Sequence, residues 1–335
     1  MSVTIYDVAK AANVSIATVS QVINNKGRIS EKTKKKVHKV MEELNYQPNI
    51  LASALMGKQT KTIGLLIPDL ANPFFSELAR SIEDSGHVFG YNIVICSTDY
   101  KVEKEVKYIS LLKQKRVDGF IFASGFEKLD QVEALMNENV PVVIVARDFP
   151  MRPLNTVAID DYMGGYQAAS YLLKLGHTNM GIIALDVWSN RERIRGFNDA
   201  LKEQNIEIRN DFEYITQGNE NLIDAGKAVA HKYVTTSNPP TAIFSCNDML
   251  AIGAIQAAKE NGFHVPSDLS IVGFDNTAIA TIVDPPLTTI SQPIEKMGKE
   301  VMDLMISIVK GERKEQLRLT LMPTLVERKS TAKLT

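Results

Sequence analysis

The sequence has very few of the residues that build disulfide-bonded, zinc-binding or membrane-spanning proteins. Its two cysteines, Cys96 and Cys246, are too far apart to suggest a disulfide framework or a zinc site. The longest apolar runs, such as IGLLIP and NIVIC, are much shorter than a membrane span. The N-terminal MSVTIYDVAK lacks the basic and apolar regions of a signal peptide. We therefore expect a cytoplasmic protein with two buried, reduced thiols.

Motifs of the common enzyme classes are also missing. No G-x-G-x-x-G follows an expected strand, and no G-x-x-x-x-G-K-[ST] occurs, so the glycines that let a phosphate approach the backbone are not there. No G-x-S-x-G elbow is paired with a placed histidine. The five histidines are scattered without metal-ligand spacing. We expect no catalytic activity, no cofactor and no metal.

Charge is distributed unevenly along the 335 residues, whose net charge is −1. Residues 1–60 carry nine basic side chains against four acidic ones, a net charge of +5, so the rest of the chain carries −6. A small basic segment on a larger acidic body suggests that the basic segment meets a polyanion. Lysine runs also occur as plain solvated helix faces, so this asymmetry alone does not decide the matter.

The basic segment is predicted to contain three helices. Apolar residues at helical spacing predict a first helix over 5–12, and Asn13 suits the left-handed turn that follows. Ser15 is a good N-cap for a second helix over 16–23, and Ser30 for a lysine-rich third. Two helices joined by a turn of about four residues are typical of a helix-turn-helix, although a small packing domain fits the same pattern.

The outer face of the second helix carries residue types that can read DNA. Valines occupy the positions that would pack on the first helix, which leaves Ile16, Ala17 and Gln21 outside. Apolar side chains contact the thymine methyl group, and glutamine can bond adenine N6 and N7 together. The hydroxyl groups of Thr18 and Ser20 suit phosphate contacts. The pattern favours insertion into the major groove of DNA.

From Lys61 onward, continuous apolar runs alternate with amphipathic stretches. Such a pattern predicts parallel sheets covered by helices on both faces. There are too many strands for one sheet, and the pattern restarts near Asp160. We therefore expect two doubly wound α/β lobes, with ligands bound at the carboxyl ends of the strands. The predicted strands cover 63–68, 92–96, 119–123, 140–146, 180–185, 241–246 and 269–274.

The head segment TIYDVAKAANVSIATVSQVIN resembles the start of a lactose/galactose repressor-family (LacI-type) transcription factor. Similar stretches continue in order along nearly the whole chain. They include YQPNILASAL, TKTIGLLIPDLANPFF, KRVDGFI, GHTNMGII, IRGF, CNDMLAIGA, VPSDLSIVGFDN and PPLTTISQP. The resemblance implies an all-α helix-turn-helix head and a hinge helix, joined to a two-lobed α/β core like that of periplasmic binding proteins.

The resemblance also implies domain boundaries. They are a DNA-binding domain over 1–47, a hinge helix and linker over 48–60, and an effector-binding and dimerisation core over 61–335. Within the core, the N-lobe would comprise about 61–160 with 292–321, and the C-lobe about 161–291 with 322–330.

The DNA-contacting residues implied by the resemblance lie in the head and the hinge. Ile16, Ala17 and Gln21 match base-reading positions, and Gln21 departs from the arginine or histidine that is common there. Leu55 matches the leucine that wedges into the minor groove, a contact that kinks DNA. Ser53 stands where some relatives have arginine. The full expected set is Thr4, Tyr6, Ser15, Ile16, Ala17, Thr18, Ser20, Gln21, Asn24, Arg28, Ala52, Ser53 and Leu55.

The effector-binding residues implied by the resemblance follow core strands. An aromatic ring of Phe74 or Phe75 would stack on the ligand, and Arg193 would bond its oxygen atoms, with Arg191 as the alternative in that register. Arginine suits this role because its planar group donates several hydrogen bonds in a fixed geometry. The full expected set is Phe74, Phe75, Arg147, Asp160, Arg191, Arg193, Asn247 and Asp275.

The sequence therefore predicts a sequence-specific DNA-binding regulator, most simply a repressor that acts as a homodimer on a palindromic operator in the bacterial cytoplasm, at the nucleoid. Its ligand would be a sugar or sugar derivative, or alternatively a purine or nucleoside. A solute-binding protein of a transporter shares the two-lobed body but lacks the basic head. In a subset of the family this sequence resembles, a phosphorylated carrier protein docks on Tyr, Asp and Arg side chains around the helix that matches 294–305. Here that helix carries Glu295, Lys296 and Asp303, so the resemblance disfavours regulation by such a partner.

Overall fold

The computed structural model describes residues 3–23, 27–46, 59–123, 129–149, 151–216 and 221–334. The chain forms two compact units, residues 1–60 and residues 61–335, and each is described by itself. No helix in the described ranges has the length and apolar character needed to cross a membrane.

The first unit contains three short helices around a small apolar core. They are α1 (Ile5–Ala12), α2 (Ile16–Ile23) and α3 (Glu31–Glu43). Their bounds follow local chemistry, because Asn13 takes the left-handed conformation at φ 48° and the Ser15 hydroxyl accepts from Thr18 N at 3.1 Å. Val19 and Val22 are buried in this core, as predicted. The helix-turn-helix arrangement of α1 and α2 is thus present.

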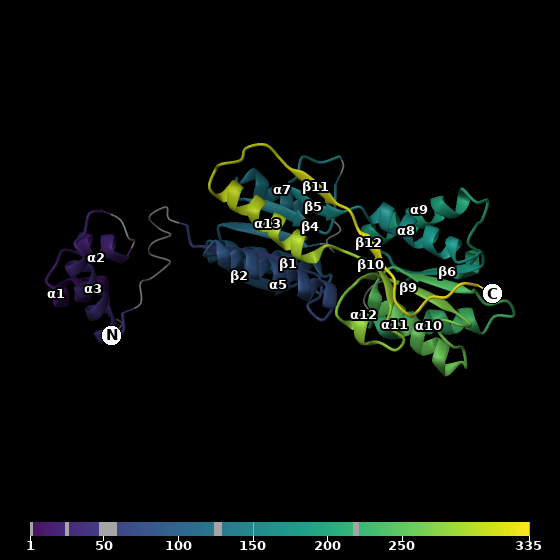
Figure 1. The fold of residues 1–335 in the computed structure, drawn as a ribbon. Coiled ribbons are helices and arrows are strands. Elements are labelled where there is room, and N and C mark those ends of the chain that lie inside the picture. Colours follow the sequence, from purple (N-terminus) through teal and green to yellow (C-terminus); the bar gives the residue numbers. More distant parts are fainter. Residues whose placement is uncertain are drawn as a thin grey trace. The chain divides into compact units, whose positions relative to one another are not determined.

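The second unit is built on two six-stranded sheets, one in each of its lobes (Figure 1). In the first lobe all strand pairs are parallel, and the central strands run as near-continuous apolar segments because both of their faces are covered. The order across this sheet is β11 (Arg318–Leu321), β5 (Thr156–Ile159), β4 (Val142–Val145), β3 (Gly119–Ala123), β1 (Thr62–Ile67) and β2 (Asn92–Ser97).

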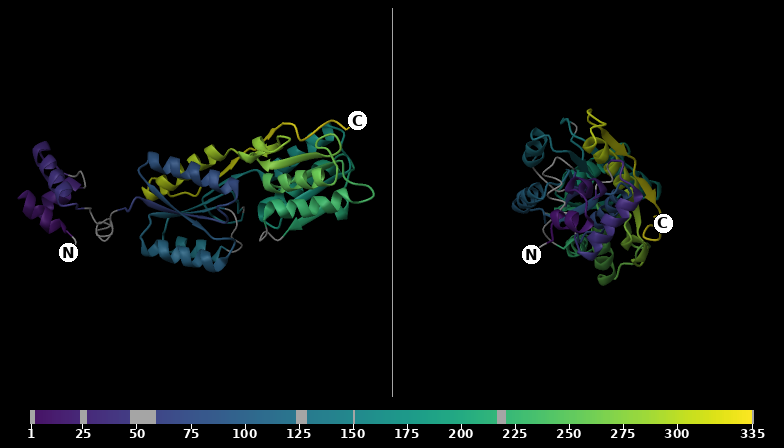
Figure 2. Two further views of the ribbon diagram at one scale, coloured as in Figure 1. Left: turned by 90° about the horizontal axis from the view of Figure 1, so that it is seen from below. Right: turned by 90° about the vertical axis from the view of Figure 1, so that its left-hand side faces the viewer.

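Helices cover both faces of the first sheet, as Figure 2 shows from below. One face packs on α5 (Pro73–Val88) and α13 (Ile294–Val309), and the other on α6 (Val102–Gln114) and α7 (Asp130–Asn137). Phe120 and Phe122 belong to the apolar cluster on the second of these faces. This layering leaves the carboxyl ends of the strands as the open edge.

The second lobe repeats the plan with one antiparallel strand at its edge. The order is β12 (Thr324–Val326), β10 (Thr288–Ser291), β9 (Ser270–Asp275), β8 (Ala242–Ser245), β6 (Met180–Leu185) and β7 (Glu213–Thr216), and only the β12–β10 pair is antiparallel. The covering helices are α8 (Asp161–Lys174) and α9 (Trp188–Lys202) on one face, and α10 (Leu222–Val234) and α11 (Asp248–Glu260) on the other. The short α12 (Ile279–Ile282) and the 3-10 turn η1 (Asn210–Phe212) complete the lobe.

Glycines bring α8 and α9 into direct backbone contact. A Cβ atom at Gly165 would lie 1.8 Å from the carbonyl oxygen of Arg193, and one at Gly196 would lie 1.9 Å from that of Tyr162. Only residues without a side chain permit this approach. The contact fixes the position along α8 at which Arg193 of α9 sits.

The described chain passes between the lobes three times. It crosses from β5 to α8, returns from β10 to α13, and crosses again from β11 to β12, each time through very few residues. The segment after β12 continues along the second lobe, where Ala332 N donates to Ser270 Oγ and Leu334 N to Leu175 O. Each lobe is therefore assembled from separate stretches of sequence.

Candidate functional site

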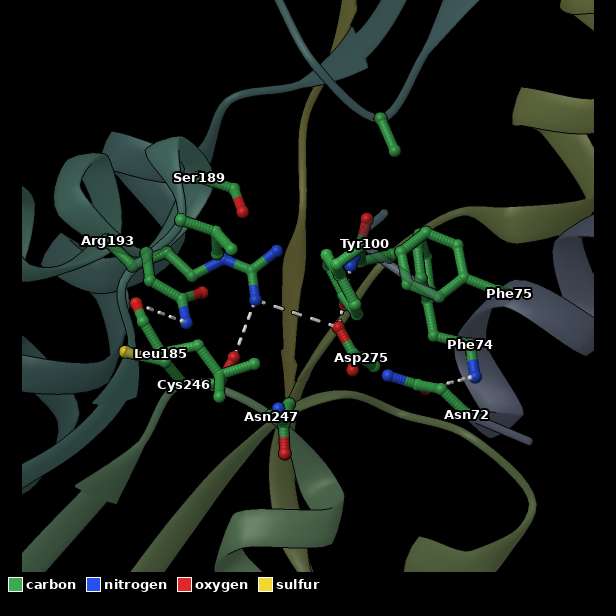
Figure 3. Close-up of a pocket in the computed structure, with 14 residues that line it drawn as sticks. Asn72, Phe74, Phe75, Tyr100, Leu185, Ser189, Arg193, Cys246, Asn247 and Asp275 are labelled. Carbon is green, nitrogen blue, oxygen red and sulfur yellow. Dashed lines mark hydrogen bonds and ion pairs between the residues drawn. The ribbon is translucent and has the colours of Figure 1, made fainter. Parts of the chain in front are cut away.

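The carboxyl ends of strands from both lobes surround a cavity with about 470 Å³ of space, part of it open to solvent (Figure 3). The cavity lies where doubly wound sheets place their ligands. Its lining residues are Asn72, Phe74, Phe75, Tyr100, Ala146, Leu185, Val187, Ser189, Asn190, Arg193, Cys246, Asn247, Asp275 and Gln292.

The first lobe contributes the aromatic side of the cavity. Asn72 caps α5 by accepting a hydrogen bond from Phe74 N at 3.0 Å, which fixes the start of the helix that carries both phenylalanines. The rings of Phe74 and Phe75 pack edge to face, 5.1 Å apart between centroids. Tyr100 lies beside them, and burial raises the pKa of its phenol to about 12. This side offers flat apolar surface and a neutral phenol.

The second lobe contributes a buried arginine that is already engaged by other protein groups. Arg193 Nε donates to Asp161 Oδ1 at 2.7 Å, and Arg193 Nη1 donates to the carbonyl oxygen of Cys246 at 2.6 Å. The guanidinium also lies 3.6 Å from the centroid of the Phe274 ring. Burial raises the pKa of Asp161 to about 6, and the nearby Arg193 cation works against that rise.

Asp275 lies between the two sides of the cavity (Figure 3). Its Oδ1 accepts from Gln292 Nε2 at 2.7 Å and is 3.8 Å from Arg193 Nη1. Burial raises the pKa of Asp275 well above its ordinary value, while the Arg193 cation opposes the change. Asp248 lies behind it, bonded to Thr277 and Thr289, and burial raises its pKa to about 6. A carboxylate is thus presented to the cavity from a buried, hydrogen-bonded setting.

Backbone strain is concentrated around the cavity. Tyr100, Ala146 and Asp275 have φ values of 55°, 60° and 113°, in a region that residues with a Cβ atom rarely adopt. Each follows or ends a core strand and lines the cavity. Because such conformations cost free energy, their gathering at one place favours a functional role for the cavity.

The structure brings together five of the eight residues predicted for the effector site. Phe74, Phe75, Arg193, Asn247 and Asp275 line the cavity, although Asn247 uses its Oδ1 to cap α11 by accepting from Leu250 N at 2.8 Å.

The other three predicted residues lie outside the cavity lining. Arg191 is paired with Asp186 at 2.6 Å on the surface of α9, with 64% of its side chain exposed. Asp160 caps α8 and lines a separate depression with Trp188. Arg147 stacks on Phe149, 4.3 Å from its ring centroid.

Several residues of the cavity lining were not predicted from the sequence. Ser189 and Asn190 precede Arg193 by four and three positions, so helical spacing could have indicated that they share its face. Asp161, which binds Arg193 from outside the cavity lining, was also not predicted, because the pattern does not show which of two adjacent aspartates turns toward the arginine. Tyr100 depends on a strained backbone that no periodicity reveals.

The candidate DNA-contacting surface belongs to the first unit. Ser15, Ala17 and Gln21 are exposed on α2, as is Ile16, whose exposed fraction is 40%. The Gln21 side chain packs against Gly27, within 3.3 Å of where a Cβ atom would be.

The polar residues predicted to contact phosphate are partly committed to local contacts. Thr18 and Ser20 are half-buried, and the Thr18 hydroxyl bonds that of Ser15 at 2.9 Å. Thr4 bonds Asp7 through both its backbone N and its hydroxyl. Tyr6 and Arg28 are exposed. The remaining predicted contacts, Asn24, Ala52, Ser53 and Leu55, lie outside the described residues, as do residues 48–58 of the predicted hinge helix and linker.

Two family models match the chain. Residues 4–49 match bacterial regulatory proteins of the lacI family, and residues 169–331 match the periplasmic binding protein-like domain. These matches confirm the predicted fold class, a helical DNA-binding head joined to a two-lobed α/β core.

Curated relatives match over essentially the full chain. The HTH-type transcriptional regulator DegA of Bacillus subtilis is 50% identical and covers 100% of this chain and 99% of its own length. The HTH-type transcriptional repressor PurR of Aliivibrio salmonicida is 37% identical, with 99% of each chain covered. Both are transcriptional regulators, in agreement with the prediction that the chain is not an enzyme.

Solved structures show the same architecture. The Lac repressor dimer bound to operator and the anti-inducer ONPF has a TM-score of 0.87 at 30% identity, with 99% of this chain and 100% of that chain covered. A LacI family transcriptional regulator from Enterococcus faecium with bound ribose has a TM-score of 0.73 at 31% identity, with 82% and 100% covered.

Proposed function

Because the chain belongs to the lacI family of bacterial regulatory proteins, we propose that it represses transcription from an operator whose occupancy is set by a sugar bound in the core cavity. The chain is a DNA-binding, ligand-responsive transcriptional regulator. The identity of the ligand and the sense of regulation are the proposed parts.

The observation that carries the proposal is the cavity itself. A flat aromatic side made by Phe74 and Phe75 faces Arg193 across the cavity, with Asp275 between them (Figure 3). Sugar rings have apolar faces that pack on aromatic rings and hydroxyl groups that donate to a carboxylate. The ribose-bound relative from Enterococcus faecium supports a sugar of this kind.

A purine is the second candidate ligand. The aromatic pair would stack on a nucleobase as well as on a sugar, and the relative at 37% identity is named PurR. The N–H groups of a purine could donate to Asp275 in place of sugar hydroxyls. The ligand experiment below separates these two chemistries.

We assign base reading to the exposed face of α2. Ile16 and Ala17 would contact thymine methyl groups, and Gln21 would read adenine. Tyr6, Arg28 and the exposed lysines of α3 would supply phosphate contacts. Ser15, Thr18 and Ser20 fit phosphate contacts through hydroxyl groups near the start of α2.

We further propose that two copies bind a palindromic operator as a homodimer at the bacterial nucleoid. The solved Lac repressor is a dimer on its operator. A ligand that prefers one arrangement of the core lobes would change operator affinity by linkage, with a sign set by the preferred arrangement. Leu55 stays a prediction for the minor-groove wedge. The proposal requires no phosphorylated carrier protein.

The proposal is tested by operator selection followed by titration. Full-length protein selects sequences from random duplex DNA, and binding to the selected site is then measured with ribose, glucose, cellobiose, hypoxanthine and guanine. We expect a palindromic site whose affinity changes at least fivefold with one sugar.

A matched pair of variants locates the response. Asp275→Ala should abolish it with DNA binding retained, and Asp186→Ala, outside the cavity lining, should leave it intact. A response to hypoxanthine or guanine alone would establish the second candidate. Failure to select any DNA sequence would refute the proposal.

A further inference from the structure

This inference rests on the proposed function. We infer that the effector is an uncharged molecule, because Arg193, the only cation in the cavity lining given above, is already paired with Asp161. Phosphate esters and carboxylates are therefore rejected by the site. Among the fourteen lining residues, Arg193 and Asp275 are the charged ones, so the inference depends on what Arg193 can still do.

The buried cluster around Arg193 already has more acidic groups than cations. Arg193 and Asp161 form an ion pair at 2.7 Å, with 8% and 2% of their side chains exposed. Asp275 is a second carboxylate, 3.8 Å from the same guanidinium and equally buried. One cation therefore faces two acidic groups. An anionic ligand would bring further negative charge into a poorly solvated site without a free cation to receive it.

The hydrogen bonds of Arg193 also limit how its guanidinium can receive an anion. A guanidinium holds a carboxylate or phosphate strongly when two of its N–H groups donate side by side. Asp161 occupies Nε, which blocks the pair formed with Nη2. Nη1 donates to the carbonyl oxygen of Cys246 and lies 3.8 Å from the Asp275 carboxyl oxygen, so an anion that approached the Nη1–Nη2 edge would meet this acidic group. Nη2 keeps both of its N–H groups, and in Figure 3 it extends into the space between the two sides of the cavity, without a free neighbouring Nε to complete the side-by-side pair.

The other polar groups of the cavity lining are neutral donors and one acidic acceptor. Asn72 and Asn247 both use Oδ1 to cap helices, which leaves their amide N–H groups as donors. Asp275 supplies the acceptor. Neutral amide donors and one partly engaged guanidinium around one acidic group match a ligand with several hydroxyl or ring N–H groups and no formal charge.

The experiment identifies the ligand without assuming its structure. Full-length protein is equilibrated with the small molecules of a bacterial extract, re-isolated, and heated to release what it holds for mass spectrometry. The Asp275→Ala variant is treated in parallel. We expect one molecule, uncharged at pH 7, that is retained by the wild type and lost by the variant.

The outcomes distinguish this inference from the proposed function. A retained molecule that carries a phosphate or carboxylate, and that Asp275→Ala loses, would overturn the inference and leave ligand regulation standing. If the wild type retains nothing beyond what the variant retains, the proposed effector site fails and the inference fails with it.

A second measurement uses inorganic phosphate as the probe. At equal ionic strength, chloride is replaced by phosphate and the change in melting temperature is measured. The change in the wild type should be no larger than the change in Arg193→Gln. In Asp161→Asn the guanidinium has lost its counter-charge, so phosphate should raise the melting temperature by about 2 °C or more. The double variant Asp161→Asn/Arg193→Gln should lose that rise. A phosphate-dependent rise in the wild type that Arg193→Gln removes would contradict the inference.

Discussion

Replacing Arg193 by methionine should destabilise the core strongly, and the loss should depend on pH. The change removes the hydrogen bond to Asp161, whose side chain is only 2% exposed, and leaves that carboxylate without a cation. Removing one partner of a buried ion pair costs about 3–5 kcal/mol. We expect a loss of this size in the free energy of unfolding at pH 8.

The pH dependence follows from the protonation of Asp161. Its pKa is about 6 in the folded chain against an ordinary 3.8, so folding favours the protonated form. The stability that this gives is fully present below pH 4 and is lost as the pH rises through 6, a change of about 3 kcal/mol. Without Arg193 the pKa rises further, so at pH 5.5 the carboxyl group is neutral and the cost of Arg193→Met should shrink to about 1–2 kcal/mol.

Trp188 provides the assay, because it is the single tryptophan and begins α9, the helix that carries Arg193. Urea unfolding followed by its fluorescence reports on the core at pH 5.5 and pH 8. Arg191→Met is the matched control, since Arg191 is exposed and pairs with Asp186 at the surface. It should cost less than about 1 kcal/mol at either pH. Equal losses of unfolding free energy for Arg193→Met at the two pH values would refute the idea that the variant leaves the buried Asp161 carboxylate without a cation.

Three further perturbations test other parts of the molecule. Gln21→Arg should shift selected operators from adenine toward guanine at one position, and an unchanged selection profile would argue against base reading. Gly165→Ala should cost at least about 1–3 kcal/mol in urea unfolding, because the new Cβ meets the Arg193 carbonyl at 1.8 Å; a neutral result would contradict that close contact. Glu77→Ala should speed hydrogen exchange at the Ala278 amide about tenfold, since Glu77 accepts from it across the lobes at 2.9 Å; unchanged exchange would exclude such a link.

Long buried elements could be predicted from the sequence, whereas edge elements could not. The runs that became β1, β3, β6 and β9 are continuously apolar because both faces of each strand are covered. The edge strand β11 reads RLTL, with two of its four residues exposed, and carries no such signal. Helix α2 was predicted with its observed bounds because Asn13 and Ser15 mark its start locally.

The candidate site was predictable only where local sequence determines direction. Asp275 directly ends an apolar strand, which puts its side chain at the open edge of the sheet. The choice between Asp160 and Asp161 depends on which one caps α8, and that is decided by the turn before the helix. The binding partner of Arg193 comes from a different helix, held in place by glycine contacts between α8 and α9. The pairing of Arg193 with Asp161 therefore depends on tertiary packing, which no local sequence pattern reveals.

The interleaving of the two lobes has a consequence for how the protein is made. The first sheet is covered by α13 and finished by β11, so α13 cannot join until about residue 309 has been synthesised and β11 not until about residue 321. At ordinary translation rates of 5–20 residues per second, roughly 10–50 s separate the DNA-binding head from a complete first lobe. The head can fold during this interval, because its small core draws on no later segment. Every nascent chain therefore passes through a stage in which its DNA-reading surface exists and its ligand sensor does not.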